Sequence, residues 1–442
     1  MSDMSQSAKL RVEALGQAPV LDLLLRLSLP ASLALLSTAL YNIIDTFWVA
    51  RLGPAAVAGV TLIFPIQLII TAAGSGTGIG LAALVSRLHG QQKSKEVKEL
   101  AHHILPLTLF LGLPLVLLAF GARSQLLHFL GARTETIKAA NDYLGFIALA
   151  SPALIFSMLA SNLLRGEGDT ITPMKAMGGA ALLNAVADPI FIFGWGAISP
   201  MGVRGAALAT GASQLLGALY LLWQVRKQVF GFLLEKATLG EVYKVGLPAA
   251  FATVILTLVV GFHNRVLAPF GALPLGAYGI LFRLYALVFM PSYGICQGLL
   301  PIVGHAVGAG QNERLKKAIN RAVLLAATWG AIAGGIVIVG AEFIVSLFGG
   351  GDQLTIEGSR ALRLAGLGWI AAGPQLVWVT ALHGMGRGGA SLFVLFLKTL
   401  GLLIPLVLLL SKSYGPTGVW LAQPLAEFGG FLIAWFVVWR VS

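Results

Sequence analysis

The stretch GLAALVSRLHG (80–90) recurs 218 residues later as GLLPIVGHAVG (298–308), and a basic segment follows each copy. At the same offset LSLPAS (27–32) aligns with VGLPAA (245–250). The offset is close to half of the 442 residues and holds across separate segments. One structural unit is therefore expected to occur twice in the chain.

The composition indicates that this unit is a membrane unit. Hydrophobic residues make up 57% of the chain, charged residues only 11%, and the mean hydropathy is +0.85. Soluble domains are about 45–50% apolar and about 25% charged. Twelve apolar runs of membrane-spanning length are separated by charged or Gly/Pro-rich breaks; they lie near 27–50, 55–86, 101–120, 139–163, 174–196, 204–225, 246–270, 275–304, 320–347, 361–382, 390–411 and 418–439.

Six spans in each copy mean that both copies enter the membrane in the same direction. We therefore predict an all-α polytopic membrane protein with twelve transmembrane helices in two parallel six-helix repeats. The predicted division is an N-terminal lobe (1–225), a cytoplasmic linker (226–243) and a C-terminal lobe (244–442).

The net charge of +12 is explained by membrane topology rather than by nucleic acid binding. Arg and Lys concentrate in alternate segments between spans, such as 87–98, 226–244 and 314–321. Placing these segments in the cytoplasm puts both termini there. The N-terminal stretch lacks a signal-peptide pattern, which favours a multi-pass protein of the inner membrane. The single cysteine, Cys296, excludes an internal disulfide and a zinc cluster, and no cofactor is expected.

An acidic residue interrupts the first span, in YNIIDTFWVARLG (41–53). Thr38, Tyr41, Asn42 and Asp45 share one helix face because their spacing is i, i+3, i+4 and i+7. An ionised carboxylate is costly in hydrocarbon, so such a group either binds a cation or takes up a proton. Both outcomes describe a coupling-ion site.

The fifth and sixth spans carry side chains that suit the same site. Asn184 and Asp188 lie one helical turn apart, and Thr210 falls at a similar depth to the two acids. Carboxylate, amide and hydroxyl oxygens also suit a sodium ion, which Asp45, Asn184, Asp188 and Thr210 would hold. The full predicted ion-coupling set is Asp45, Asp188, Asn184, Thr210 and Tyr41.

Two further observations bear on this site. In the second repeat His263 stands at the position of Asp45, so coupling is expected in the N-terminal half alone. The competing interpretation is that each acid caps a helix end or pairs with Arg51 or Arg204.

Weaker signals point to a substrate cavity. Gln67, Ser161 and Asn162 line such a cavity or make interhelical hydrogen bonds, and the sequence favours neither. Thr38 is a further candidate for the cavity. Arg283 is expected to face a wet cavity and to contact substrate or lipid headgroups. Lys398 and Glu427, on the last two spans, are expected to form an ion pair.

Taken together, YNIIDTFWVARLG after LSLP, the GxGxG-and-basic-loop pattern of 76–98, LLRGEGDTITPM (163–174) and NAVADP (184–189) resemble the multidrug and toxic compound extrusion (MATE) transporters. The resemblance covers nearly the whole chain. It implies a V-shaped pair of lobes around a central cavity that exports organic, often cationic, compounds in exchange for protons or sodium.

The resemblance also implies roles for individual residues. In the DinF-like prokaryotic branch the coupling acids lie in the N-terminal lobe, and Asp45, Asn184, Asp188 and Thr210 match that arrangement, with Tyr41 beside them. The other bacterial branch uses acids in the seventh helix, and 246–270 contains none.

We therefore expect a proton- or sodium-coupled antiporter that works by alternating access, not an enzyme, whose partners are a drug-like small molecule and the lipid bilayer. A lipid-linked oligosaccharide flippase is the first alternative, although it would need several cavity arginines or lysines and only Arg283 and Lys398 are candidates. An intramembrane aspartyl protease would carry YD and GxGD motifs, which surround neither acid. A scaffold or receptor without transport predicts no ion-dependent flux.

Overall fold

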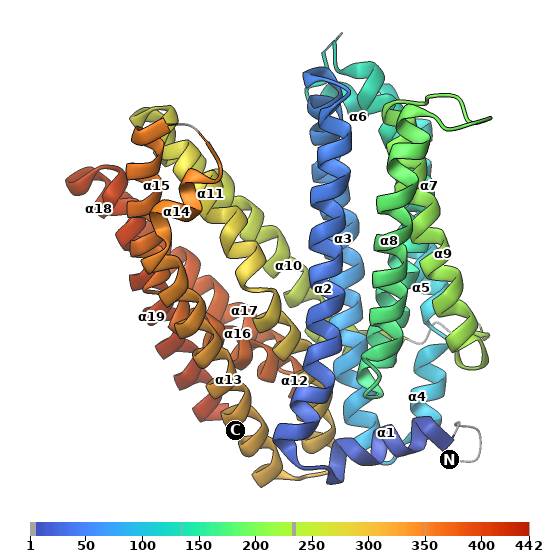
Figure 1. Ribbon diagram of the computed structural model, residues 1–442. Coiled ribbons are helices and arrows are strands. Elements are labelled where there is room, and N and C mark those ends of the chain that lie inside the picture. The colour runs from blue at the N-terminus through green and yellow to red at the C-terminus, as the bar shows by residue number, and fades with distance from the viewer. Residues whose placement is uncertain (1–5, 134, 232–235, 350, 442) are drawn as a thin grey trace. The chain divides into compact units, whose positions relative to one another are not determined.

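The computed structural model describes residues 6–133, 135–231, 236–349 and 351–441 (Figure 1). Apart from turns and connecting loops, the chain in these ranges is helical, and β pairing is limited to one bridge between Trp195 and Ile198. The predicted all-α class is confirmed.

The first half of the chain forms ten helices among the described residues. They are α1 (Gln6–Gln17), α2 (Val20–Ala50), α3 (Pro54–Gly90), α4 (Ser94–Ala101), α5 (Ile104–Gly121), α6 (Arg123–Phe129), α7 (Ile137–Gly166), α8 (Ile171–Phe193), α9 (Val203–Val229) and α10 (Lys236–Leu267).

The second half continues from α10 through a 3₁₀ turn, η1 (Ala268–Phe270). Its elements are α11 (Ala272–Val288), α12 (Met290–Gly308), α13 (Asn312–Val339), α14 (Ala341–Ser346), α15 (Gly351–Gly366), α16 (Trp369–Gly384), α17 (Gly388–Phe396), the π-helix η2 (Leu397–Leu403), α18 (Ile404–Tyr414) and α19 (Pro416–Val441).

The number of spans agrees with the twelve that the sequence predicts. Eleven helices of the described chain are long and apolar enough to cross a membrane. The pair α15 and α16, bent by 50° at a short break, makes the twelfth and contains the predicted run 361–382. At the break Gly368 packs so closely on α19 that a Cβ there would lie 2.7 Å from the Cα of Pro424.

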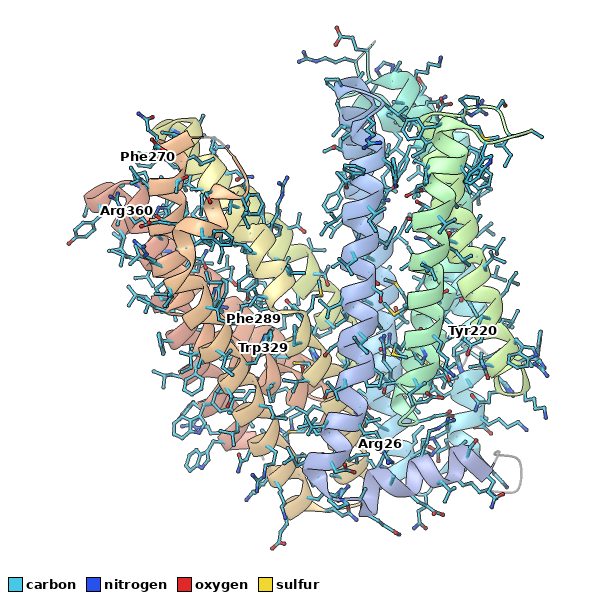
Figure 2. All side chains as sticks on the ribbon, viewed as in Figure 1. Arg26, Tyr220, Phe270, Phe289, Trp329 and Arg360 are labelled. Carbon is cyan, nitrogen blue, oxygen red and sulfur yellow. The ribbon has the colours of Figure 1, made fainter. Side chains whose placement is uncertain are left out.

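Two other predicted spans are interrupted. The run 275–304 divides into α11 and α12, where Pro291 in the first turn of α12 cannot donate a backbone hydrogen bond. The carbonyl that ends α11, Val288, instead accepts a hydrogen bond of 2.8 Å from the indole of Trp329. Figure 2 labels Trp329 beside Phe289, the residue at the break. The run 390–411 contains the π-helix η2, a widened turn that often marks a functional position.

The chain divides into two compact units, each described here by itself. Among the described residues the first unit is 33–250, and the second is 6–32 together with 251–441. The helices α2 and α10 thus each contribute to both units. The predicted lobes and linker stay a prediction, and residues 232–235 of the linker lie outside the described residues.

Equivalent glycines bring the helices of each unit into close contact. A Cβ on Gly80 of α3 would lie 3.0 Å from the backbone nitrogen of Gly246 on α10. A Cβ on Gly298 of α12 would lie 2.6 Å from the hydroxyl of Ser28 on α2. Gly298 is the repeat equivalent of Gly80, and Ser28 is that of Gly246. Small residues at such crossings let membrane helices approach closely.

Candidate ion-coupling site

The centre of the site lies on α8, where Asn184 and Asp188 are 1% and 0% exposed. Their spacing of one helical turn lets the Asn184 amide nitrogen donate a hydrogen bond of 3.2 Å to Asp188 Oδ1. Pro189, the next residue, has no N–H to donate to the carbonyl of Ala185. This turn of α8 is therefore rich in oxygen acceptors.

The helix α9 adds a hydroxyl to this turn. The two helices form a tight hairpin (Figure 1), in which a Cβ on Gly205 would lie 2.3 Å from the carbonyl oxygen of Phe191. This approach lets the Asn184 amide reach across to Thr210 Oγ1 at 3.3 Å. Thr210 is itself buried. The predicted grouping of Asn184, Asp188 and Thr210 is present in the structure.

The helix α2 brings Asp45 and Tyr41 to the same place. Asp45 is half-buried, and its carboxylate interacts electrostatically with that of Asp188. Tyr41 lies one turn before Asp45, within electrostatic reach of both acids. All five residues of the predicted set thus lie together within the first unit.

Among the residues that the structure describes, three buried oxygen atoms at this site have no hydrogen-bond donor. They are Asp45 Oδ1, Asp188 Oδ2 and Asn184 Oδ1. A buried acceptor without a partner is costly, and for a carboxylate the cost is larger. Protein groups alone leave these acceptors unsatisfied, so the donor set suits an added proton or a small hard cation.

Neither arginine that could have neutralised these acids does so. Arg204 forms an ion pair with Asp142 of α7, at 3.6 Å. Arg51 lies over the rings of Phe47 and Trp48, 4.5 and 4.8 Å from their centroids. The simple structural role that the sequence left open, pairing of the acids with these arginines, is absent from the described residues.

Sequence reasoning missed Tyr143 of α7. Its side chain is buried and interacts electrostatically with Asp45, Tyr41 and Asp188. Gln67 of α3 donates a hydrogen bond of 3.3 Å to the Tyr143 hydroxyl. Gln67 therefore lies at the edge of the ion-coupling site.

The structure does not bring the other predicted cavity residues to the ion-coupling site. Thr38 donates to the carbonyl of Ala34 in its own helix, at 3.1 Å. Ser161 and Asn162 follow Tyr143 on α7 by about 27 Å at the rise of an α-helix. Arg283 belongs to the second unit and is exposed on α11.

The second unit has its own buried polar groups. The predicted pair is confirmed, because Lys398 Nζ lies 2.6 Å from Glu427 Oε2. His263, which replaces Asp45 in the repeat, is fully buried and stacks on Tyr278 with ring centroids 5.0 Å apart. Its ring nitrogens contact the carbonyl of Val259 at 2.8 Å and Gln423 at 3.1 Å. The His263 ring is therefore fixed in place by contacts with two side chains and one backbone carbonyl.

A transition-metal site is not formed by the described residues, where no group of three or more His, Cys, Asp or Glu side chains could hold a metal ion. Sodium remains compatible with the site on α2, α8 and α9, because its ligands there would include amide and hydroxyl oxygens.

Known proteins similar to this chain are membrane transporters. A protein from Shewanella oneidensis named FAD transporter is 26% identical over 431 residues, which cover 96% of this chain and 95% of that protein. The multidrug export protein MepA of Staphylococcus aureus is 26% identical over 438 residues, 96% of each chain.

Solved structures share the fold. A MATE protein in its straight conformation superposes with a TM-score of 0.92 at 24% identity, over 99% of this chain and 98% of that one. A MOP superfamily transporter from Pyrococcus furiosus gives a TM-score of 0.90 at 24% identity, with the same coverage. These likenesses confirm the twelve-helix fold of two repeats.

The profile of one family matches the chain twice, at residues 30–190 and 248–409. The matches begin 218 residues apart, which is the offset of the internal repeat. Together they cover most of the sequence. The chain belongs to the MatE family of multi-pass membrane transporters, and its activity is transport rather than enzymatic catalysis.

Proposed function

We propose that this protein is an antiporter of the bacterial inner membrane, which exports organic cationic compounds in exchange for protons or sodium ions. The observation that carries the proposal is the pair of acids Asp45 and Asp188, whose buried oxygens Oδ1 and Oδ2 have no donor. Asn184 and Thr210 supply neutral oxygens beside them. The proposed orientation has both termini in the cytoplasm.

The two acids would give the coupling ion its effect on conformation. Without a bound cation or proton, the charges of Asp45 and Asp188 repel each other. Binding of the ion removes this repulsion, so the helices α2 and α8 prefer a different packing. An ion shifts such an equilibrium only through its different affinity for the two states. Transport by alternating access follows when the substrate prefers the other state.

The substrate class is proposed from the relatives together with the site. MepA is named a multidrug export protein, and the Shewanella protein is named for FAD, which is anionic. The two carboxylates favour cationic compounds for this chain. The flippase alternative gains no support, since one of the two membrane cations available to it, Lys398, is bound to Glu427.

The test is efflux of a fluorescent cationic dye from proteoliposomes that contain the purified full-length protein. A pH gradient and a sodium gradient are imposed separately, for the wild type, Asp45→Asn and Asp188→Asn. The matched control is Asp142→Asn, which removes an acid of the same unit that is paired with Arg204. FAD serves as a competing anionic substrate.

The proposal expects flux that is driven by one gradient, lost in both site variants and retained in the control. Flux that survives in Asp45→Asn and Asp188→Asn would make these acids structural. Selective transport of FAD would contradict the proposed substrate class while leaving the ion site intact.

A further inference from the structure

An open concavity on α13 lies apart from the ion-coupling site, in the second unit. Its volume is about 450 Å³, and its lining residues are Lys317, Asn320, Arg321 and Leu324. Their spacing of i, i+3, i+4 and i+7 places them on one face of the helix.

The N-terminal part of this face carries two cations, and one acid, the exposed Glu313, lies a helical turn before Lys317. Lys317, Asn320 and Arg321 are exposed to solvent. Among the residues that the structure describes, neither Lys317 nor Arg321 forms an ion pair with a carboxylate. An ammonium and a guanidinium one turn apart, with an amide between them, form a donor set that suits a phosphate group.

Beyond these residues the exposed side of α13 is mostly apolar, apart from Thr328. Leu324, Ile332, Ile336 and Val339 follow at helical spacing and are 57%, 53%, 63% and 86% exposed. From Lys317 to Val339 the helix rises about 33 Å, close to the thickness of the hydrocarbon core, about 30 Å. The helix α13 is one of the membrane-spanning helices. The cations thus stand at the level of lipid headgroups, and the apolar side chains stand at the level of the acyl chains.

We propose that this face of α13 is a binding site for an anionic phospholipid, with its phosphate between Lys317 and Arg321 and the first part of an acyl chain along Leu324. A soluble phosphate would use only the cationic end. A zwitterionic lipid would place a second cation beside Lys317 and Arg321. The combination of two cations that form no ion pair in the described part of the chain with an adjoining apolar side chain, Leu324, therefore favours an anionic lipid.

The experiment is native mass spectrometry of the full-length protein in detergent, titrated with phosphatidylglycerol or phosphatidylcholine. The test variant is Lys317→Gln/Arg321→Gln. The matched control is Lys316→Gln/Lys95→Gln, which removes two other exposed lysines and so changes the net charge equally. Leu324→Gln tests the apolar part without a change of charge.

We expect the test variant to bind phosphatidylglycerol about tenfold more weakly than wild type, and the control to bind as wild type does. Leu324→Gln should also weaken binding, and phosphatidylcholine should bind less tightly than phosphatidylglycerol to the wild type. If the double variant does not fold, the single variants Lys317→Gln and Leu324→Gln carry the same expectation of weaker binding.

Equal losses in the test and control variants would overturn the proposal, because the effect would then be general electrostatic attraction. Equal affinity for the two lipids would overturn it as well. Competition by inorganic phosphate at millimolar concentration would reassign the concavity to a soluble anion. None of these outcomes depends on ion-coupled transport.

Discussion

Asn184 on α8 and Thr210 on α9 are joined by a hydrogen bond of 3.3 Å from the amide nitrogen to the hydroxyl oxygen. The same amide nitrogen donates to Asp188 Oδ1, so one side chain fixes a hydroxyl and a carboxylate at the same time. The amide oxygen is left without a donor, as is the second carboxylate oxygen. The Asn184 side chain is thus the organising centre of the ion-coupling site.

Thr210→Val tests the hydroxyl directly. Valine keeps the shape of threonine but removes one oxygen ligand and one acceptor for Asn184. We expect the apparent affinity for the coupling ion to fall by about fivefold or more, as measured from the ion dependence of dye efflux. Thr210→Ser should retain most of the affinity. Thr38→Val is the control, because Thr38 bonds only to a carbonyl of its own helix; an equal loss there would contradict a specific role for Thr210.

Protons and sodium should compete at Asp45 and Asp188. A carboxylate that holds a proton cannot also serve as a full anionic ligand, so raising the pH should strengthen sodium binding and lowering it should weaken binding. Isothermal titration calorimetry with sodium at several pH values measures this directly, with Asp142→Asn as the control. Sodium binding that does not change with pH, or that survives in Asp188→Asn, would place the sodium ion elsewhere.

The residues of the site differ in how well the sequence could predict them. Asp45, Asn184 and Asp188 are polar groups in apolar runs, and helical periodicity alone puts them on faces that point inward. Tyr143 lies in the apolar segment YLGFIALA, where an aromatic residue gives no signal of a polar contact. Its place in the site depends on the packing of α7 against α3, α8 and α9, which no local pattern encodes.

The breaks within the predicted spans also show how far local sequence patterns can predict the structure. The twelve apolar runs follow from hydrophobicity, which depends on composition. The break between α11 and α12 coincides with Pro291, a local signal. The hydrogen bond from Trp329 to the carbonyl of Val288, 41 residues away, could not be predicted from a local pattern. The Lys398–Glu427 pair could be predicted because two opposite charges in adjacent spans have few other partners.

That pair predicts an asymmetric response to substitution. Lys398→Met leaves Glu427 buried and without its cation, which in soluble proteins costs about 3–5 kcal/mol. The melting temperature should therefore fall clearly. In Lys398→Met/Glu427→Gln both charges are absent, and most of the loss should be recovered. Thermal unfolding in detergent checks both, and a double variant no more stable than Lys398→Met would show that the lysine acts through packing rather than through charge.

The equivalent glycine contacts predict an equivalent sensitivity in the two units. Gly80→Leu would force a side chain against α10, where even a Cβ would lie 3.0 Å from the backbone nitrogen of Gly246. Gly298→Leu would meet Ser28 of α2 in the same way, with the Cβ 2.6 Å from the hydroxyl.

Both variants should fold in lower yield and melt at lower temperature, because backbone atoms at these crossings cannot move aside as a flexible side chain can. Gly179→Leu on α8 is the control, since nothing lies within 4 Å of a Cβ there. Thermal unfolding and the yield of monodisperse protein measure the effect. A loss for only one of the two glycines would mean that the repeats, although alike in sequence, no longer depend equally on their helix crossings.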